Sequence, residues 1–145
     1  MRLVVNTFLT LDGVMQAPGG PDEDRDGGFE FGGWSFPYFD DDMGATVDAS
    51  IGAASAILLG RKTYDIFAAY WPKVSEEHDD GSIATNLNRL PKYVASTTLE
   101  SADWANTTVV SGDVAEEVRR IKSQVEGELN VQGSGNLLQT LQRYG

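Results

Sequence analysis

The 145-residue chain contains no cysteine and a single histidine, His78. The lack of cysteine excludes a disulfide framework, a thiolate metal site and a cysteine nucleophile. A lone imidazole in an acidic segment also argues against a transition-metal site and a Ser-His-Asp triad. Basic residues are scarce as well: 11 lysines and arginines face 22 acidic residues, for a formal net charge of −11. That charge repels phosphate backbones and anionic lipids, so we expect no nucleic-acid partner and no membrane partner.

Long hydrophobic runs and targeting signals are missing too. No apolar stretch approaches the ~20 residues that a membrane span requires, and the opening MRLVVNTFLTLDG turns polar before a signal-peptide core develops. We therefore expect a cytoplasmic protein. Asp22, Asp24 and Asp26 imitate the first half of a calcium-binding EF-hand loop, but Gly33 stands where that loop demands a bidentate glutamate. We expect no metal site.

The chain does contain an alternation of strand-like and helix-like segments, and at roughly 150 residues per domain its length indicates one domain. Apolar runs typical of strands lie at residues 3–5, 56–59, 92–96, 107–110 and 129–132. Helical periodicity begins near residues 40, 63, 113 and 137, whereas residues 16–34 predict a long loop and 75–82 a polar excursion. The alternation predicts an α/β fold with a mostly parallel central sheet and helices on both faces.

Three junctions follow predicted strands and carry glycines, hydroxyls or cations. They are Gly60-Arg61-Lys62-Thr63, Ser96-Thr97-Thr98 and Gly133-Ser134-Gly135-Asn136. In an open α/β sheet, ligands bind beyond the carboxyl ends of the strands, so these junctions can line one crevice. Bare N–H groups at glycines and at a helix N-terminus suit phosphate, and the two adjacent cations supply opposing charge. The ligand that this pattern indicates is an elongated polyphosphate such as a dinucleotide.

Each junction also has a purely structural interpretation. A strand-Gly-x-Gly-helix junction is often only a tight connection, and Leu138 stands where the Rossmann fingerprint demands glycine or alanine. Arg61 and Lys62 alone would be a solvated pair, and Ser96-Thr97-Thr98 alone a plain turn. Their shared place along one predicted sheet edge is what favours a ligand.

Four motifs, taken together, resemble a known family. They are LDG (11–13), LLGRKTY (58–64), PKYVAST (91–97) and VQGSGNLLQTL (131–141). In this order and spacing they resemble the dihydrofolate-reductase-like superfamily and, within it, the reductase domain of bacterial riboflavin-biosynthesis deaminase-reductases and its stand-alone relatives. The resemblance covers nearly the whole chain and implies a dihydrofolate-reductase-like fold for residues 1–145.

The same resemblance implies an NADPH-binding reductase. By similarity, the junction at 60–63 holds the pyrophosphate and the adenosine 2′-phosphate side, and Ser96 and Thr97 lie along the adenosine half. The junction at 133–136 wraps the pyrophosphate near the nicotinamide. Relatives often carry a cation where this chain has Asn136. NADH therefore stands as an alternative cofactor.

Catalytic roles are also implied only by similarity. Thr10, Leu11 and Asp12 match the loop that passes over the nicotinamide, and the acid that assists proton delivery falls within residues 40–42. We assign the catalytic roles to Asp12 and Asp41. The expected reaction moves hydride to a small nitrogen heterocycle, a pteridine or a compound like 5-amino-6-(5-phosphoribosylamino)uracil. The alternative is a non-catalytic module that binds a dinucleotide or a heterocycle without turnover.

An oligomeric partner follows from the end of the sequence. Relatives continue past the last helix into further strands, whereas this chain stops at Tyr144-Gly145. We therefore expect a domain that lacks the final strands and leaves an unpaired sheet edge, which readily accepts another strand. Because relatives of this kind are usually dimeric, we expect a homodimer.

Overall fold

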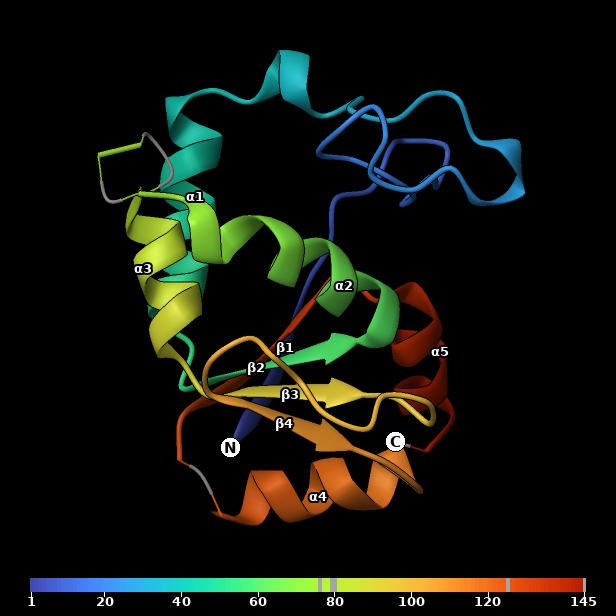
Figure 1. Ribbon diagram of the computed structural model, residues 1–145, viewed down its shortest axis with the longest axis vertical. Helices are drawn as coiled ribbons and strands as arrows, with labels where there is room; N and C mark the ends of the chain where they lie inside the picture. Colours follow the sequence, from blue (N-terminus) through green and yellow to red (C-terminus); the bar gives the residue numbers. More distant parts are fainter. Residues whose placement is uncertain (76, 79–80, 125, 145) are drawn as a thin grey trace.

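The computed structural model describes residues 1–75, 77–78, 81–124 and 126–144. Within these residues, five strands form one sheet in the order β1-β5-β2-β3-β4, and every neighbouring pair is parallel (Figure 1). The strands are β1 (Arg2–Asn6), β2 (Ala56–Gly60), β3 (Lys92–Ala95), β4 (Thr107–Val110) and β5 (Glu128–Gln132). The predicted α/β class and parallel sheet are confirmed.

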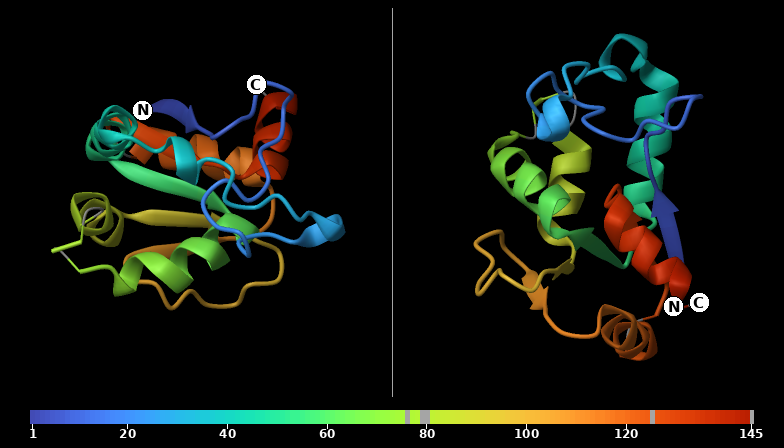
Figure 2. Two further views of the ribbon diagram at one scale, coloured as in Figure 1. Left: turned by 90° about the horizontal axis from the view of Figure 1, so that it is seen from above. Right: turned by 90° about the vertical axis from the view of Figure 1, so that its right-hand side faces the viewer.

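Helices cover both faces of this sheet. One face carries α1 (Asp41–Gly52), α2 (Arg61–Tyr70) and α3 (Gly81–Arg89), and the other carries α4 (Val114–Gln124) and α5 (Gly135–Arg143). Figures 1 and 2 show α1 and α3 side by side on the first face. The central strand β2 explains this layering: Ile57 and Leu59 pack toward α1–α3, whereas Ala56 and Leu58 pack toward α4 and α5. All four side chains are fully buried, so this run has an apolar residue at every position rather than at alternate ones.

Two features of the chain between β2 and β4 differ from the sequence prediction. Residues 81–89 form α3, because Ile83, Ala84 and Leu87 bury one apolar face. The predicted polar excursion at 75–82 therefore includes the first two residues of α3, and its residues 76, 79 and 80 lie outside the described part. The connection from β3 to β4 contains no helix; Trp104 instead buries its ring against the first face of the sheet. The expected strict alternation is wrong at this crossover.

The long loop predicted after β1 is confirmed, and it is folded onto itself. Apart from short 3-10 turns at Asp26–Gly28 and Phe36–Tyr38, residues 7–40 contain no helix or strand. Backbone bonds join Gly33 N–H to the Ala17 carbonyl at 2.8 Å and Ser35 N–H to the Pro18 carbonyl at 3.1 Å. The indole N–H of Trp34 donates to the carbonyl of Gln16 at 2.8 Å. The loop therefore has a defined shape, and it lies beyond the carboxyl end of β1 near α2 (Figures 1 and 2).

Candidate functional site

The two glycine junctions meet, because β2 and β5 are neighbours in the sheet. The backbone N–H of Gly60 donates to the Ser134 hydroxyl at 2.8 Å, and Thr63 Oγ1 lies 3.1 Å from the same hydroxyl. Ser134 Oγ also lies 2.8 Å from the carbonyl oxygen of Gln132, which can accept its proton. One serine side chain therefore ties the start of α2 to the start of α5, as the predicted shared crevice requires.

The backbone at the second junction is shaped like an anion cradle. Gly133 and Ser134 both have positive φ, 52° and 62°, and α5 begins at the next residue. The first backbone N–H groups of α5 have no partner within the helix, and the helix dipole favours negative charge at this end. The N–H of Gly133 is held by the carbonyl of Asn6 at 2.9 Å. A Cβ on residue 135 would lie 3.3 Å from Met15 Sδ, so glycine at this position lets Met15 pack closely against the start of α5.

The third junction, Ser96-Thr97-Thr98, forms a turn that the Ser96 side chain closes. Ser96 is buried, and its hydroxyl accepts the N–H groups of Thr98 at 3.2 Å and Leu99 at 3.0 Å. Ser96 therefore closes a turn, and Thr97 and Thr98 are exposed beside it. Arg61 reaches the Thr98 hydroxyl at 3.5 Å, while its Nε donates to both Asp65 carboxylate oxygens at 2.9 Å.

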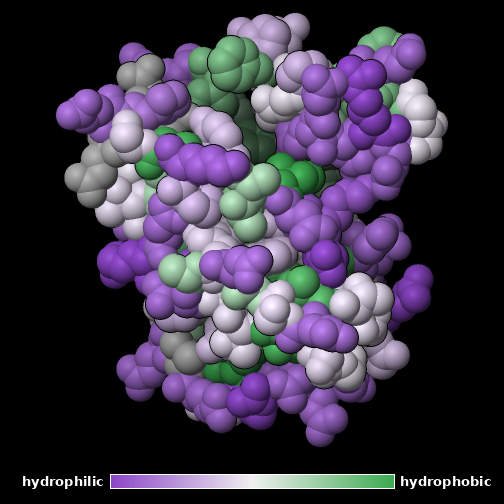
Figure 3. Space-filling model, in the orientation of Figure 1, coloured by the Kyte–Doolittle hydropathy of each residue, from purple (hydrophilic) through white to green (hydrophobic). Residues whose placement is uncertain are grey.

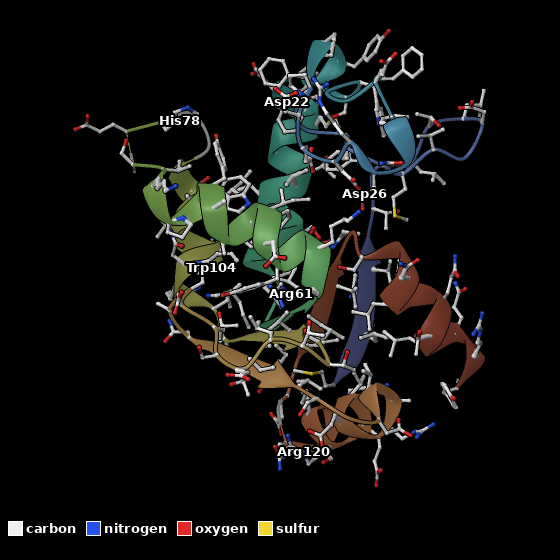
Figure 4. All side chains as sticks on the ribbon, turned by 45° about the vertical axis from the view of Figure 1, so that its right-hand side comes forward. Asp22, Asp26, Arg61, His78, Trp104 and Arg120 are labelled. Carbon is white, nitrogen blue, oxygen red and sulfur yellow. The ribbon has the colours of Figure 1, made fainter. Side chains whose placement is uncertain are left out.

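Lys62 is held by the long loop. Its ammonium contacts Asp24 at 3.1 Å and also pairs with Asp26, while Gln16 donates to the backbone carbonyls of both aspartates. The hydrogen bond that this ammonium donates to the Asp26 carboxylate raises the pKa of Lys62. Burial opposes ionisation of Asp24, yet the Asp26 N–H and the Lys62 ammonium outweigh it and lower the pKa of Asp24. We call this contact of Lys62 with Asp24 and Asp26 the acidic latch; Figure 4 labels Asp26 in this loop and Arg61 on α2.

The segment expected to pass over the nicotinamide forms a tight turn. Thr10 Oγ1 donates to Asp12 at 2.7 Å and accepts the Val14 N–H at 2.7 Å. The Thr10 bond lowers the pKa of Asp12, so this exposed side chain is a carboxylate at neutral pH. Leu11 projects fully into solvent.

The acids at the start of α1 divide their roles. Asp40 caps the helix by accepting the N–H of Met43 at 2.9 Å. Asp41 and Asp42 are exposed in the first turn, where negative charge complements the helix dipole. Asp41 thus lies on the helix that forms one wall of the cavity described next, but its side chain does not line that cavity.

Sequence reasoning missed a cavity of about 270 Å³ between β1, α1 and the end of β5. Its walls are Asn6, Thr7, Phe8, Met43, Thr46, Val47, Ser50 and Gln132. Gln132 directly precedes the second glycine junction, so the cavity adjoins the cradle. A signal for it existed: Asn6 and Gln132 are polar residues at the carboxyl ends of paired strands, the rule that located the glycine junctions.

The remaining surface is mainly hydrophilic on the face shown in Figure 3, with apolar side chains in the hollows between polar ones and in groups that project at the top of the view. A second, more open hollow of about 710 Å³ runs along α2 beside Asp65 and Trp104. Among the described residues, no three or more histidines and carboxylates gather as a metal site would require. None of the helices in the described ranges has the length and hydropathy needed to cross a bilayer.

Comparison with known proteins agrees with this architecture. The family model for the RibD C-terminal domain matches residues 2–145. The uncharacterized protein YyaP of Bacillus subtilis (strain 168) is 24% identical over 144 residues, which cover 99% of this chain and 69% of the relative. The match confirms the resemblance inferred from the four sequence motifs. The chain belongs to the RibD C-terminal domain family.

Proposed function

We propose that the protein is a reductase that binds NADPH across the two glycine junctions and delivers hydride to a small nitrogen heterocycle in the 270 Å³ cavity. Membership in the RibD C-terminal domain family supports reductase activity. The observation that carries the proposal is the joining of both glycine junctions by Ser134 next to that cavity.

The residues present fit a dinucleotide. The N-terminus of α5, which follows the positive-φ residues Gly133 and Ser134, suits a pyrophosphate. Arg61 lies at the exposed end of the same edge, where a 2′-phosphate would separate NADPH from NADH. When bound, the cofactor supplies the hydride, and the protein supplies position and electrostatics.

The cavity adjoining the cradle suits a planar ring. Phe8, Met43 and Val47 offer apolar contacts, while Asn6 and Gln132 offer hydrogen bonds. None of the residues that line it is ionisable. The proton that accompanies hydride transfer must therefore come from water or from an acid outside the wall, and Asp41 on the same helix is our candidate. The substrate class that we propose is a pteridine or a ribosylaminouracil-like pyrimidine.

The absence of an ionisable group from the cavity wall also favours the second candidate, a binding module without turnover. Titration of the protein with NADPH and with NADH, followed by nicotinamide fluorescence, tests cofactor binding. NADPH oxidation at 340 nm with pteridine and aminouracil substrates tests turnover. NADPH binding with turnover supports the reductase, binding alone supports the module, and no binding of either cofactor at millimolar concentration rejects both dinucleotide proposals.

A further inference from the structure

Three side-chain amides form a fixed arrangement beside the cavity, and two of them, Asn6 and Gln132, line it. Asn130, on β5, is completely buried. Its amide nitrogen lies 3.3 Å from the carbonyl oxygen of Ser50 and 3.4 Å from the Ser50 hydroxyl. A backbone carbonyl only accepts hydrogen bonds, so the nitrogen of Asn130 must face α1 and its oxygen must face the other way. The orientation of this amide is therefore set by its surroundings.

That orientation fixes two further amides. The oxygen of Asn130 accepts hydrogen bonds from Asn6 Nδ2 at 2.7 Å and from Gln132 Nε2 at 2.9 Å. Both neighbours therefore present nitrogen to Asn130, and each keeps its side-chain carbonyl oxygen for another partner. Among the described residues, no donor bonds to the side-chain oxygen of Asn6 or of Gln132. Neither oxygen is fully buried, so both are accessible to solvent. Asn6 and Gln132 both line the cavity.

We infer that Asn6 and Gln132 form a pair of neutral carbonyl acceptors that select a heterocycle carrying N–H donors, with Asn130 as the residue that positions them. This inference rests on the proposed function, because it takes the 270 Å³ cavity as the ring site. Two uncharged acceptors fit a neutral lactam or ureido N–H next to an amino group. A ring that presents only acceptors leaves the side-chain oxygens of Asn6 and Gln132 without a donor after their water is removed, which opposes binding.

Two closely related probes test the selection. Uracil carries two ring N–H donors, and 1,3-dimethyluracil carries methyl groups in their place and presents only acceptors. We expect the unmethylated ring to bind the NADPH-saturated protein at least about tenfold more tightly, the discrimination expected for losing hydrogen-bond donors. Saturation-transfer NMR or calorimetry measures both affinities, and NADPH binding is measured separately by fluorescence.

Variants identify the residues responsible. Gln132→Met removes one acceptor at similar size, and Gln139→Met makes the same change at an exposed position on α5. Gln132→Met lowers the ratio of the two affinities at least about threefold and leaves NADPH binding intact, whereas Gln139→Met leaves the ratio unchanged. Asn130→Leu lowers the same ratio, which a loss of packing alone would not do because both rings would weaken together.

The outcomes separate this inference from the proposed function. Equal affinities for the two rings, or no binding of either ring while NADPH binds, overturns the inference and leaves the cofactor proposal standing. A ratio that survives Gln132→Met also overturns it. If neither cofactor binds but the unmethylated ring is still selected, the acceptor pair stands and the reductase proposal falls.

Discussion

The hydroxyl of Ser134 accepts the backbone N–H of Gly60 at 2.8 Å, joining the start of α5 to the end of β2. Their closeness limits both positions: a Cβ on residue 60 would lie 3.3 Å from the Cβ of Ser134. Ser134 also holds a left-handed conformation, with φ 62° and ψ 49°. Its hydroxyl bonds offset a backbone strain that a non-glycine residue normally avoids.

Replacing Ser134 with alanine removes these bonds but keeps the strained conformation. We expect the free energy of unfolding to fall by about 1–2 kcal/mol, because the N–H of Gly60 loses its partner. We also expect NADPH affinity to fall about tenfold as the two junctions separate. Urea denaturation and fluorescence titration measure the two effects. Ser123→Ala, at an exposed site on α4 whose hydroxyl bonds only within its own helix, is the control. Unaltered NADPH binding in Ser134→Ala would place the cofactor elsewhere.

Arg61 and Asp65 make opposite predictions for cofactor preference. The carboxylate of Asp65 accepts the Arg61 Nε–H with both oxygens at 2.9 Å, so the guanidinium is shared before a phosphate arrives. Arg61→Ala should weaken NADPH about tenfold or more and leave NADH little changed, because a charge-assisted phosphate bond contributes roughly 1.5–3 kcal/mol. Asp65→Asn should tighten NADPH. Calorimetry with both cofactors decides the matter; equal losses in Arg61→Ala would put this residue on the shared pyrophosphate or outside the site.

Removing a negative charge from the acidic latch should raise the affinity of the protein for an anion. Asp24 is only 14% exposed and, with Asp26, occupies the ammonium of Lys62. Asp26→Asn should raise the affinity for inorganic pyrophosphate several-fold at low salt, since Lys62 is then freer to meet the anion. Asp22→Asn removes the same charge from the same loop, where Asp22 pairs with Arg25 instead. If both variants behave alike, the gain reflects net charge and the latch does not compete with the ligand.

Much of the fold was predictable, because burial leaves a direct mark on sequence. The β2 run reads as a strand since all four of its apolar residues are inside the protein. Residues 81–89 were missed because only three apolar side chains, Ile83, Ala84 and Leu87, are fully enclosed there among polar neighbours. The way the connection from β3 to β4 packs could not be predicted either, because it depends on a contact between distant segments. The Trp104 indole N–H donates to the Asn88 side-chain oxygen at 2.7 Å.

The candidate site divides in the same way. Glycine junctions after parallel strands could be located because the carboxyl ends of such strands share an edge. The cavity has a weaker signal: Asn6 and Gln132 end paired strands, but a polar residue at a strand end is unremarkable alone, and the Ser50 wall comes from a helix. Capture of Lys62 by Asp24 was beyond the sequence, since charge pairing across 38 positions depends on how the loop folds.

The free edge of β1 carries the proposal of a homodimer. Among the described strands, β1 pairs only with β5, and Val5 is 47% exposed on that outer strand. We expect a dimer mass at micromolar concentration that persists at high salt, because salt screens the repulsion between like-charged copies and leaves apolar contact intact. Val5→Lys should shift the mass toward monomer, and Leu11→Lys, an exposed apolar site off the edge, should not. Light scattering after size exclusion measures both; a monomer at all salts would refute the dimer.

Because Lys92 is buried, we expect the free energy of unfolding to rise at alkaline pH. Its ammonium is completely buried, 4.5 Å from the centre of the Trp104 ring, and donates to the carbonyls of Leu87 at 2.7 Å and Leu90 at 2.8 Å. Burial lowers the pKa of Lys92 to about 8 from 10.5. Between these values the unfolded chain binds more protons, so the free energy of unfolding should increase with pH, by up to about 1.4 kcal/mol per pH unit. Urea denaturation at pH 8 and pH 10 measures this slope. In Lys92→Met the lysine contribution disappears, while ordinary tyrosine and lysine titrations remain; an identical slope in both proteins would mean that the carbonyls and the Trp104 face keep Lys92 charged throughout.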